Sequence, residues 1–225
     1  MAKLSAVVAP VLLLLPGLLA SVTAARAAEE PPLVSAEHRL ILEPVDPAWR
    51  DVLAGLDQRT TVDAPFEEHR WFPFRKKPVV LKGEVRIDAT QGLSLQYREP
   101  KESIVIIDRQ GMLMRQGGRE TTPPADVRAD AANEALLHIL RFDFASLAAS
   151  FELYGRRADK AWTLALVPRA EELRRTLGAI IVTGEADLVR RIELRRSAVQ
   201  RVEIFVGDPR PPAPFTAEEL RRFFR

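Results

Sequence analysis

Short segments in which apolar and polar side chains alternate are the feature that most limits how this chain can fold. Residues 82–88 and 93–97 are two such segments, and each carries its apolar side chains on one side. These side chains are Val85, Ile87, Leu93, Leu95 and Tyr97. A period of two is typical of β-strands, whose successive side chains point to opposite faces. The connections are too short for crossover helices, so we expect neighbouring strands to run antiparallel.

The same reasoning predicts eight or nine strands along the chain. The candidate segments are residues 66–72, 82–88, 93–97, 103–108, 112–116, 161–167, 177–184, 186–195 and 199–206. Asp108-Arg109-Gln110-Gly111 predicts a turn into residues 112–116, whereas the polar stretch 117–126 predicts a loop.

Helical spacing returns in four places. Asp46-Pro47 can start a helix that ends near Asp57, because Asp caps free amides and Pro fits the first turn. Residues 132–140 and 144–151 predict two short helices in mid-chain, and Thr216 with Glu219 forms a capping box for a terminal helix. The predicted fold class is therefore α+β, with a strongly curled antiparallel sheet whose concave side must be filled.

The N-terminus has the layout of a cleaved secretory signal. Lys3 precedes the uncharged run 6–20, and Ala25-Arg26-Ala27 offers small residues at the cleavage positions. An uncleaved membrane anchor is the alternative, but Pro10 and Pro16 disfavour it. We expect residues 1–27 to be the signal, 28–208 one domain, and 209–225 a proline-rich spacer with a C-terminal helix; the mature protein is then periplasmic.

Composition argues against several classes of function. Loss of Lys3 and Arg26 with the signal leaves equal numbers of basic and acidic side chains, so we expect no nucleic-acid partner. The chain has no cysteine, which excludes disulfides, thiol catalysis and cysteine-bound metals.

Motifs for catalysis and for cofactors are missing. The three histidines, His38, His69 and His138, lack the spacing of a metal site, and the chain has neither a G-x-S-x-G elbow nor a glycine-rich phosphate loop. Glu67 and Glu68 are adjacent on a predicted strand, so their carboxylates point to opposite faces. We therefore expect no enzyme activity, no cofactor and no metal.

Several consecutive segments resemble the LolA-type family of periplasmic outer-membrane lipoprotein carriers, from about Leu53 to Val206. The segments that carry the resemblance are Phe66-Glu67-Glu68, Leu81-Lys82-Gly83-Glu84-Val85, Leu95-Gln96-Tyr97-Arg98-Glu99-Pro100, Ser103-Ile104-Val105-Ile106-Ile107-Asp108 with Gly111 and Leu113, and Trp162-Thr163-Leu164-Ala165-Leu166-Val167-Pro168. The resemblance is spread along the chain rather than concentrated in one sharp motif.

The resemblance implies an incomplete β-barrel with helices over its mouth, which carries the acyl chains of a lipoprotein across the periplasm. It also implies a monomer that receives cargo from an inner-membrane exporter and delivers it to an outer-membrane acceptor. Where the family has an Arg-Pro pair, this chain reads Asp88-Ala89-Thr90-Gln91-Gly92, with Ala89 in place of the arginine. Because that arginine is associated with cargo handling, the cargo is either a lipoprotein or another lipid.

A lipid site would be lined by apolar side chains from the sheet and from the mid-chain helices. The sheet candidates are Val85, Ile87, Leu95, Tyr97, Ile104, Ile106, Met112 and Met114, and the helix candidates are Leu136, Leu137, Leu140, Phe144 and Leu147. Plain core packing is the alternative for each of them. Met112 and Met114 are the better pair, because flexible thioethers suit irregular cargo.

Two other functions stay open at this stage. The same scaffold could be a non-enzymatic sensor or binding module of the cell envelope that contacts a partner protein. An envelope hydrolase would need a convergent polar pocket, which the sequence does not indicate.

Overall fold

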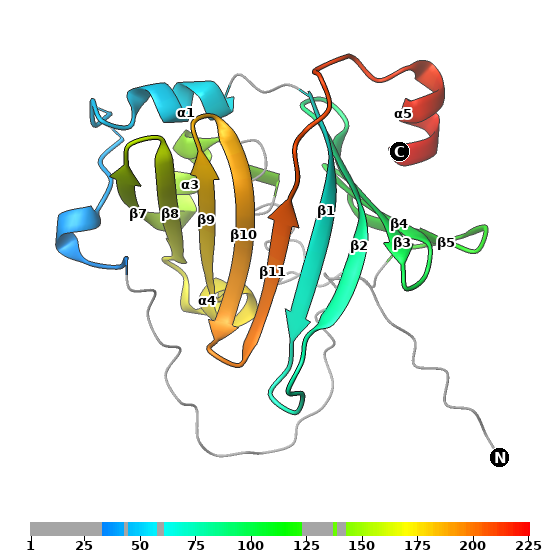
Figure 1. The fold of residues 1–225 in the computed structure, drawn as a ribbon, viewed down its shortest axis with the longest axis horizontal. Helices are drawn as coiled ribbons and strands as arrows, with labels where there is room; N and C mark the ends of the chain where they lie inside the picture. The colour runs from blue at the N-terminus through cyan, green and yellow to red at the C-terminus, as the bar shows by residue number, and fades with distance from the viewer. Residues whose placement is uncertain (1–32, 43–44, 58–60, 123–136, 139–142) are drawn as a thin grey trace.

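A computed structural model describes residues 33–42, 45–57, 61–122, 137–138 and 143–225. Its eleven strands form one antiparallel sheet in the order β6-β5-β4-β3-β2-β1-β11-β10-β9-β8-β7 (Figure 1). The edge strands β6 and β7 do not pair with each other, so the sheet stays open. This confirms the predicted fold class, a curled and incomplete barrel with helices.

The strands are mostly six to eleven residues long. Most follow their sheet neighbour in the chain, but a long connection leads from β6 at one edge to β7 at the other. Their bounds are β1 Thr61–Trp71, β2 Val79–Asp88, β3 Gly92–Glu99, β4 Ser103–Asp108, β5 Gly111–Gln116, β6 Arg119–Thr121, β7 Phe151–Ala158, β8 Ala161–Pro168, β9 Ala179–Glu185, β10 Leu188–Ser197 and β11 Gln200–Val206. β1 and β11, the first and last strands along the chain, pair with each other in the middle of the sheet.

The helices are short and lie between or beyond the strands. Their bounds are η1 Ala36–His38, α1 Arg50–Asp57, α3 Phe144–Ser150, α4 Glu171–Leu177 and α5 Ala217–Phe223. The capping box predicted for the terminal helix is present, with Thr216 Oγ1 accepting from the amide of Glu219 at 3.2 Å. Within the part of the chain that the structure describes, no helix has the length and apolar character needed to cross a membrane.

Two strands and one helix were not predicted, because their local sequence signals are weak. β6 falls in the polar stretch predicted as a loop, and β7 begins at Phe151, which was predicted to end a helix. Phe151 continues the helical spacing of Phe144 and Leu147. Its side chain is buried in the same apolar cluster as Leu147, but Phe151 is the first residue of a strand. α4 precedes β9 in a segment for which no element was predicted apart from Leu177, and Gly178 separates the two with a φ of 70°.

The register divides the side chains of the sheet between two faces. We call the face that packs against α1 and α3 the inner face, and the opposite one the outer face. Cross-strand partners share a face, so the pairs Ala64–Val85, Val85–Leu95 and Leu95–Val105 extend the inner face from β1 to β4.

The outer face over β10 and β11 is charged. Glu193 is fully buried there, because Arg191 donates to it at 2.6 Å and Arg195 donates to it at 2.6 Å and 3.1 Å. Trp71 donates to the neighbouring Glu203 at 2.5 Å. Over β10 and β11 the outer face therefore carries a network of paired charges.

The C-terminal helix α5 docks on the outer face of β2–β5. The guanidinium of Arg86 lies 3.7 Å from the centre of the Phe223 ring, and Arg115 donates to the carbonyl of Phe224 at 2.9 Å. Both arginines lie on the outer face, and Phe223 and Phe224 are buried. The spacer before α5 is held by Arg210, which lies 2.8 Å from Glu84.

Candidate functional site

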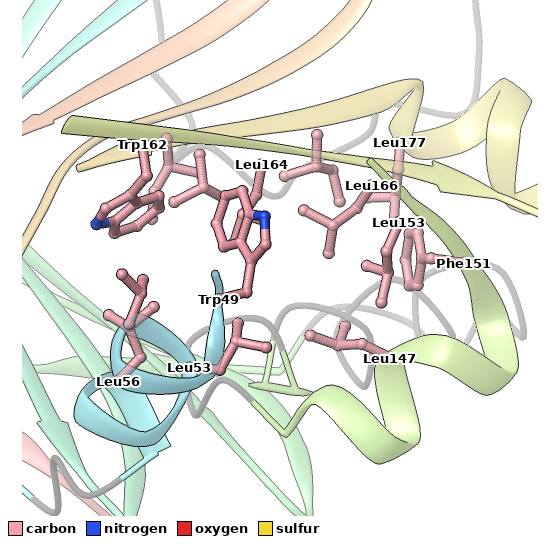
Figure 2. Close-up of a cluster of buried hydrophobic side chains, with 14 residues drawn as sticks. Trp49, Leu53, Leu56, Leu147, Phe151, Leu153, Trp162, Leu164, Leu166 and Leu177 are labelled. Carbon is pink, nitrogen blue, oxygen red and sulfur yellow. The ribbon is translucent and has the colours of Figure 1, made fainter. Parts of the chain in front are cut away.

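The inner face carries two apolar clusters. The first, which we call the helix-filled cluster, lies under α1 and α3 and covers β7–β10 (Figure 2). Its buried members are Trp49, Val52, Leu53, Leu56, Leu147, Phe151, Leu153, Trp162, Leu164, Leu166, Leu177, Ile180, Val182 and Ile192. In Figure 2 the side chains of Trp49, just before α1, of Leu53 in α1 and of Leu147 in α3 point toward the sheet. The chain's own helices therefore occupy this half of the inner face.

The second, which we call the β1–β5 cluster, lines the other half. Its buried members are Ala64, Phe66, Leu81, Val85, Leu93, Leu95, Tyr97, Val105, Ile107, Met112 and Leu137. Among the described residues, Leu137 is the one member that comes from outside the sheet. An extended apolar surface of this kind can bury hydrocarbon, since each apolar Å² removed from water contributes about 25 cal/mol.

Five of the thirteen residues predicted to line a lipid site are members of the β1–β5 cluster. Val85, Leu95, Tyr97, Met112 and Leu137 are members, and Ile87 packs against it. Met114 pairs with Val105 and so shares the inner face. The structure brings these residues together, and their role in lipid binding stays a prediction.

Ile104 and Ile106 were placed on the wrong face. Their cross-strand partners are Gln96 and Ser94, so both point outward, to the face on which α5 docks. Val105 and Ile107 line the inner face instead. The run 103–107 is apolar at four successive positions, so its own pattern does not reveal which side faces the core.

The predicted helix residues separate into two groups. Leu147 belongs to the helix-filled cluster and Phe144 packs against it, away from the β1–β5 cluster. Leu136 and Leu140 lie outside the described residues. Of the predicted helix side chains, the structure therefore places only Leu137 beside the lining from the sheet.

A buried polar group that the sequence analysis did not single out lies on the same inner face. Glu68 is fully buried, accepts from Arg70 Nε at 2.5 Å, and accepts from the Tyr97 hydroxyl at 2.8 Å. The Phe66 ring meets Tyr97 edge-on, with the ring centres 5.4 Å apart. The alternation of Phe66, Glu68 and Arg70 along one predicted strand face was the signal, since an apolar neighbour two positions away indicates burial.

Burial controls how these groups ionise. It raises the pKa of the Glu68 carboxyl, against the lowering effect of Arg70. It also raises the pKa of the Tyr97 hydroxyl well above its ordinary value, and the charge of Glu68 acts in the same direction. Tyr97 therefore stays a neutral hydrogen-bond donor at physiological pH.

Glu67 and Glu68 lie on opposite faces, as their adjacency predicts. Glu67 is on the outer face, 2.6 Å from His69 and 3.2 Å from Lys82. The carboxylates therefore do not form an acid–base pair. The described residues also contain no group of three or more His, Asp or Glu side chains that could hold a metal ion.

Ala89, at the place of the family's arginine, is exposed in the turn between β2 and β3. It lies beyond the strands that carry the β1–β5 cluster. A guanidinium nevertheless reaches the inner face, from Arg70 on β1.

An open groove of about 490 Å³ crosses the sheet near Gly83. Its charged lining is largely neutralised, because Lys82 pairs with Glu67 at 3.2 Å and Arg98 pairs with Glu84 at 3.3 Å. These four side chains lie on the outer face, whereas Phe66 of the β1–β5 cluster also lines the groove.

Comparison with known proteins gives one family match. The model of the family described as outer membrane lipoprotein carrier protein LolA-like matches residues 41–215, which is most of the chain. The search of curated proteins finds no match to the sequence.

Several solved structures are similar to this chain. A LolA superfamily protein of Nitrosomonas europaea is 8% identical with a TM-score of 0.40, and the match covers 76% of this chain and 96% of that one. The structure of the Pseudomonas aeruginosa MucA/MucB complex is 16% identical with a TM-score of 0.39, and the match covers 77% of this chain and 59% of that one. LprF of Mycobacterium bovis is 11% identical with a TM-score of 0.35, and the match covers 73% of this chain and 92% of that one.

Proposed function

This chain belongs to the LolA-like family of outer membrane lipoprotein carrier proteins, and from that premise we propose that it is a periplasmic lipid carrier. It binds the acyl chains of a lipoprotein or another lipid against the β1–β5 cluster and shuttles them from the inner to the outer membrane. The observation that carries this proposal is the continuous apolar lining of the inner face from β1 to β5.

The energetic scale of the task fits such a lining. Each methylene moved from water to an apolar site contributes about 0.8 kcal/mol, so a long acyl chain represents on the order of 10 kcal/mol. A carrier must nearly match the membrane in apolar character without exceeding it, because otherwise the cargo would not leave. A lining formed by strands and covered from outside the sheet suits reversible filling better than the helix-filled cluster does.

The first test is whether lipid accompanies the protein. The protein is recovered from the cell envelope in mild conditions, and an organic extract is analysed by mass spectrometry. We expect acyl lipid in near-stoichiometric amount. Lipid-free protein in repeated preparations would contradict the proposal.

The second test compares the two faces of the sheet. Met114→Glu places a charge on the inner face, whereas Ile104→Glu places the same charge on the outer face, and both positions are partly exposed. We expect Met114→Glu to weaken binding of a fluorescent fatty-acid probe about tenfold or more, since an unpaired charge is costly in an apolar site. Ile104→Glu should bind as the wild type does. Equal affinity of the two variants would rule out the inner face as the site.

A binding module that contacts a partner protein is the second candidate function. The observation that favours it is the helix-filled cluster, because there the chain's own side chains take up half of the inner face. This candidate predicts a stable protein partner, protein free of lipid, and no transfer of lipid between vesicles.

A further inference from the structure

The loop between β1 and β2 exposes aromatic side chains that the fold does not bury. Phe74 is 82% exposed, and its ring stacks on Phe72 with the ring centres 5.4 Å apart and 25° between the planes. The amide of Arg75 donates to the carbonyl of Phe72 at 3.0 Å, which closes a turn around Pro73. The loop thus has a built shape that holds an apolar tip in water, and such exposure usually marks a contact surface.

Three cations follow this tip directly. Arg75, Lys76 and Lys77 are exposed, and no carboxylate of the described residues lies within 4 Å of their charged groups. The arginines on the outer face behave differently, since Arg191 and Arg195 are paired with the buried Glu193. The positive charge of the loop is therefore open to an anionic partner.

The turn between β10 and β11 lies at the same end of the sheet. β1 and β11 pair as far as Trp71 and Arg201, so both turns project beyond this last pair, at the lower end of the view in Figure 1. The turn adds Val199, which is 57% exposed. We call Phe72, Phe74, Arg75, Lys76, Lys77 and Val199 the basic–aromatic tip.

We propose that the basic–aromatic tip docks this protein on the surface of an anionic lipid bilayer. Aromatic rings settle at the level of the headgroups, and each cation near an anionic surface contributes about 1 kcal/mol. A stable protein interface buries about 800 Å² on each partner, which asks for a broad surface rather than a loop tip. A bilayer requires only that the apolar tip enter the headgroup region by about 5–10 Å. The proposal concerns a surface distinct from the acyl site. Only the use of such docking, which is the exchange of lipid with a membrane, rests on the proposed function.

The test measures co-sedimentation with vesicles. All variants are recovered from the cell envelope, and mass spectrometry checks that they have the same N-terminus. Differences in vesicle binding then come from the substitutions in the tip. We expect the wild type to bind phosphatidylcholine vesicles that contain phosphatidylglycerol, to bind pure phosphatidylcholine vesicles much less, and to dissociate as salt is raised.

Two variants remove the two kinds of contact. Lys76→Gln with Lys77→Gln should weaken binding about tenfold or more, from about 1 kcal/mol for each cation. Phe74→Ser should weaken it to a similar degree, because the ring no longer enters the headgroup region. Neither change removes a buried contact, so we expect all variants to keep the fold.

Matched controls exist at other exposed positions. Lys160→Gln with Arg109→Gln removes two exposed cations from turns at the opposite end of the sheet, and Ile41→Ser removes an apolar side chain that is 63% exposed. These variants should bind vesicles as the wild type does. Equal losses in the control and tip variants would overturn the proposal, since general charge or apolar surface would then suffice.

The remaining outcomes are also decisive. If the wild type does not bind anionic vesicles, or if tip variants lose an acidic protein partner but not vesicle binding, membrane docking is wrong. Binding of the fatty-acid probe is measured in parallel. Loss of vesicle binding with intact probe binding in the tip variants supports docking as a separate property. If the wild type binds anionic vesicles but no acyl probe, the docking proposal stands and the proposed carrier function is wrong.

Discussion

Glu67 and Glu68 show how one step along a strand changes the environment of a carboxyl group. Hydrogen bonds from His69 and Lys82 lower the pKa of Glu67 on the outer face. Burial raises the pKa of Glu68 on the inner face. Since strand side chains alternate between faces, neighbouring residues of the same chemistry acquire opposite shifts.

These shifts predict opposite pH dependences of stability. Folded Glu68 keeps its proton at pH values at which the unfolded chain has released it. The free energy of unfolding should therefore fall as pH rises from about 4.5 through the raised pKa. We expect a Glu68→Gln variant to lose this slope in urea titrations at successive pH values, whatever its stability at one pH.

Glu67→Gln is the matched control. Folded Glu67 releases its proton more easily than the unfolded chain does, so its contribution is present above pH 4.5 and is lost as pH falls through the lowered pKa. The variant should therefore lose less stability than the wild type on acidification. Identical slopes in the wild type and both variants would show that neither carboxyl is shifted by folding.

At the scale of elements, α5 illustrates a helix that could be predicted as a helix but not placed. Its capping box is local, so Thr216 and Glu219 predict it. Its position depends on contacts with residues more than a hundred positions away, such as those of Arg115 with Arg222 and Phe224. A proline-rich spacer and a charged helix surface do not reveal such contacts.

The docking of α5 should be an important part of stability. Phe224 is 1% exposed, so we expect Phe224→Ala to lower the free energy of unfolding by about 3 kcal/mol or more. Phe215, whose ring lies 5.4 Å from that of Phe224, is only partly buried, and Phe215→Ala should cost about a third as much. Denaturant unfolding measures both, and a small effect of Phe224→Ala would mean that α5 does not contribute to folding.

At the scale of the whole molecule, one sheet supports two different halves. α1 and α3 fill the inner face over β7–β10, whereas the strands themselves provide nearly all described members of the β1–β5 cluster. Among the described residues, a single curled sheet thus carries one apolar cluster packed by helices and another built almost entirely from its own strands.

The two halves should differ in hydrogen exchange. The amides of β8 and β9, which are central strands under the helix-filled cluster, should exchange only through global unfolding. Those of β6, an edge strand with all three residues exposed, should exchange about a hundredfold faster or more. Mass spectrometry of exchanged peptides measures this, and uniform protection across the sheet would contradict the division.

Sequence reasoning predicted five of the eleven buried members of the β1–β5 cluster, and it selected the wrong face at β4. The two-residue turn predicted at Arg109-Gln110 already implied that Met112 faces Ile107 and Met114 faces Val105. Applied to β4, that turn would have selected Val105 and Ile107 in place of Ile104 and Ile106. The alternation along β1 indicated that Glu68 and Arg70 share a buried face, but the contact with Tyr97 could not be predicted, because Tyr97 lies two strands away.

What the sequence determined by itself is therefore local: the period of the strands, the end of α1 at Asp57, the start of α5, and the family resemblance that the match over residues 41–215 confirmed. Periodicity and capping act within a few residues, so they can be seen in the sequence alone. Only the tertiary structure decided which side of β4 faces inward, which half of the sheet the helices fill, and where α5 docks. These depend on the register between distant strands, and a shift of one residue would exchange the two faces of a strand.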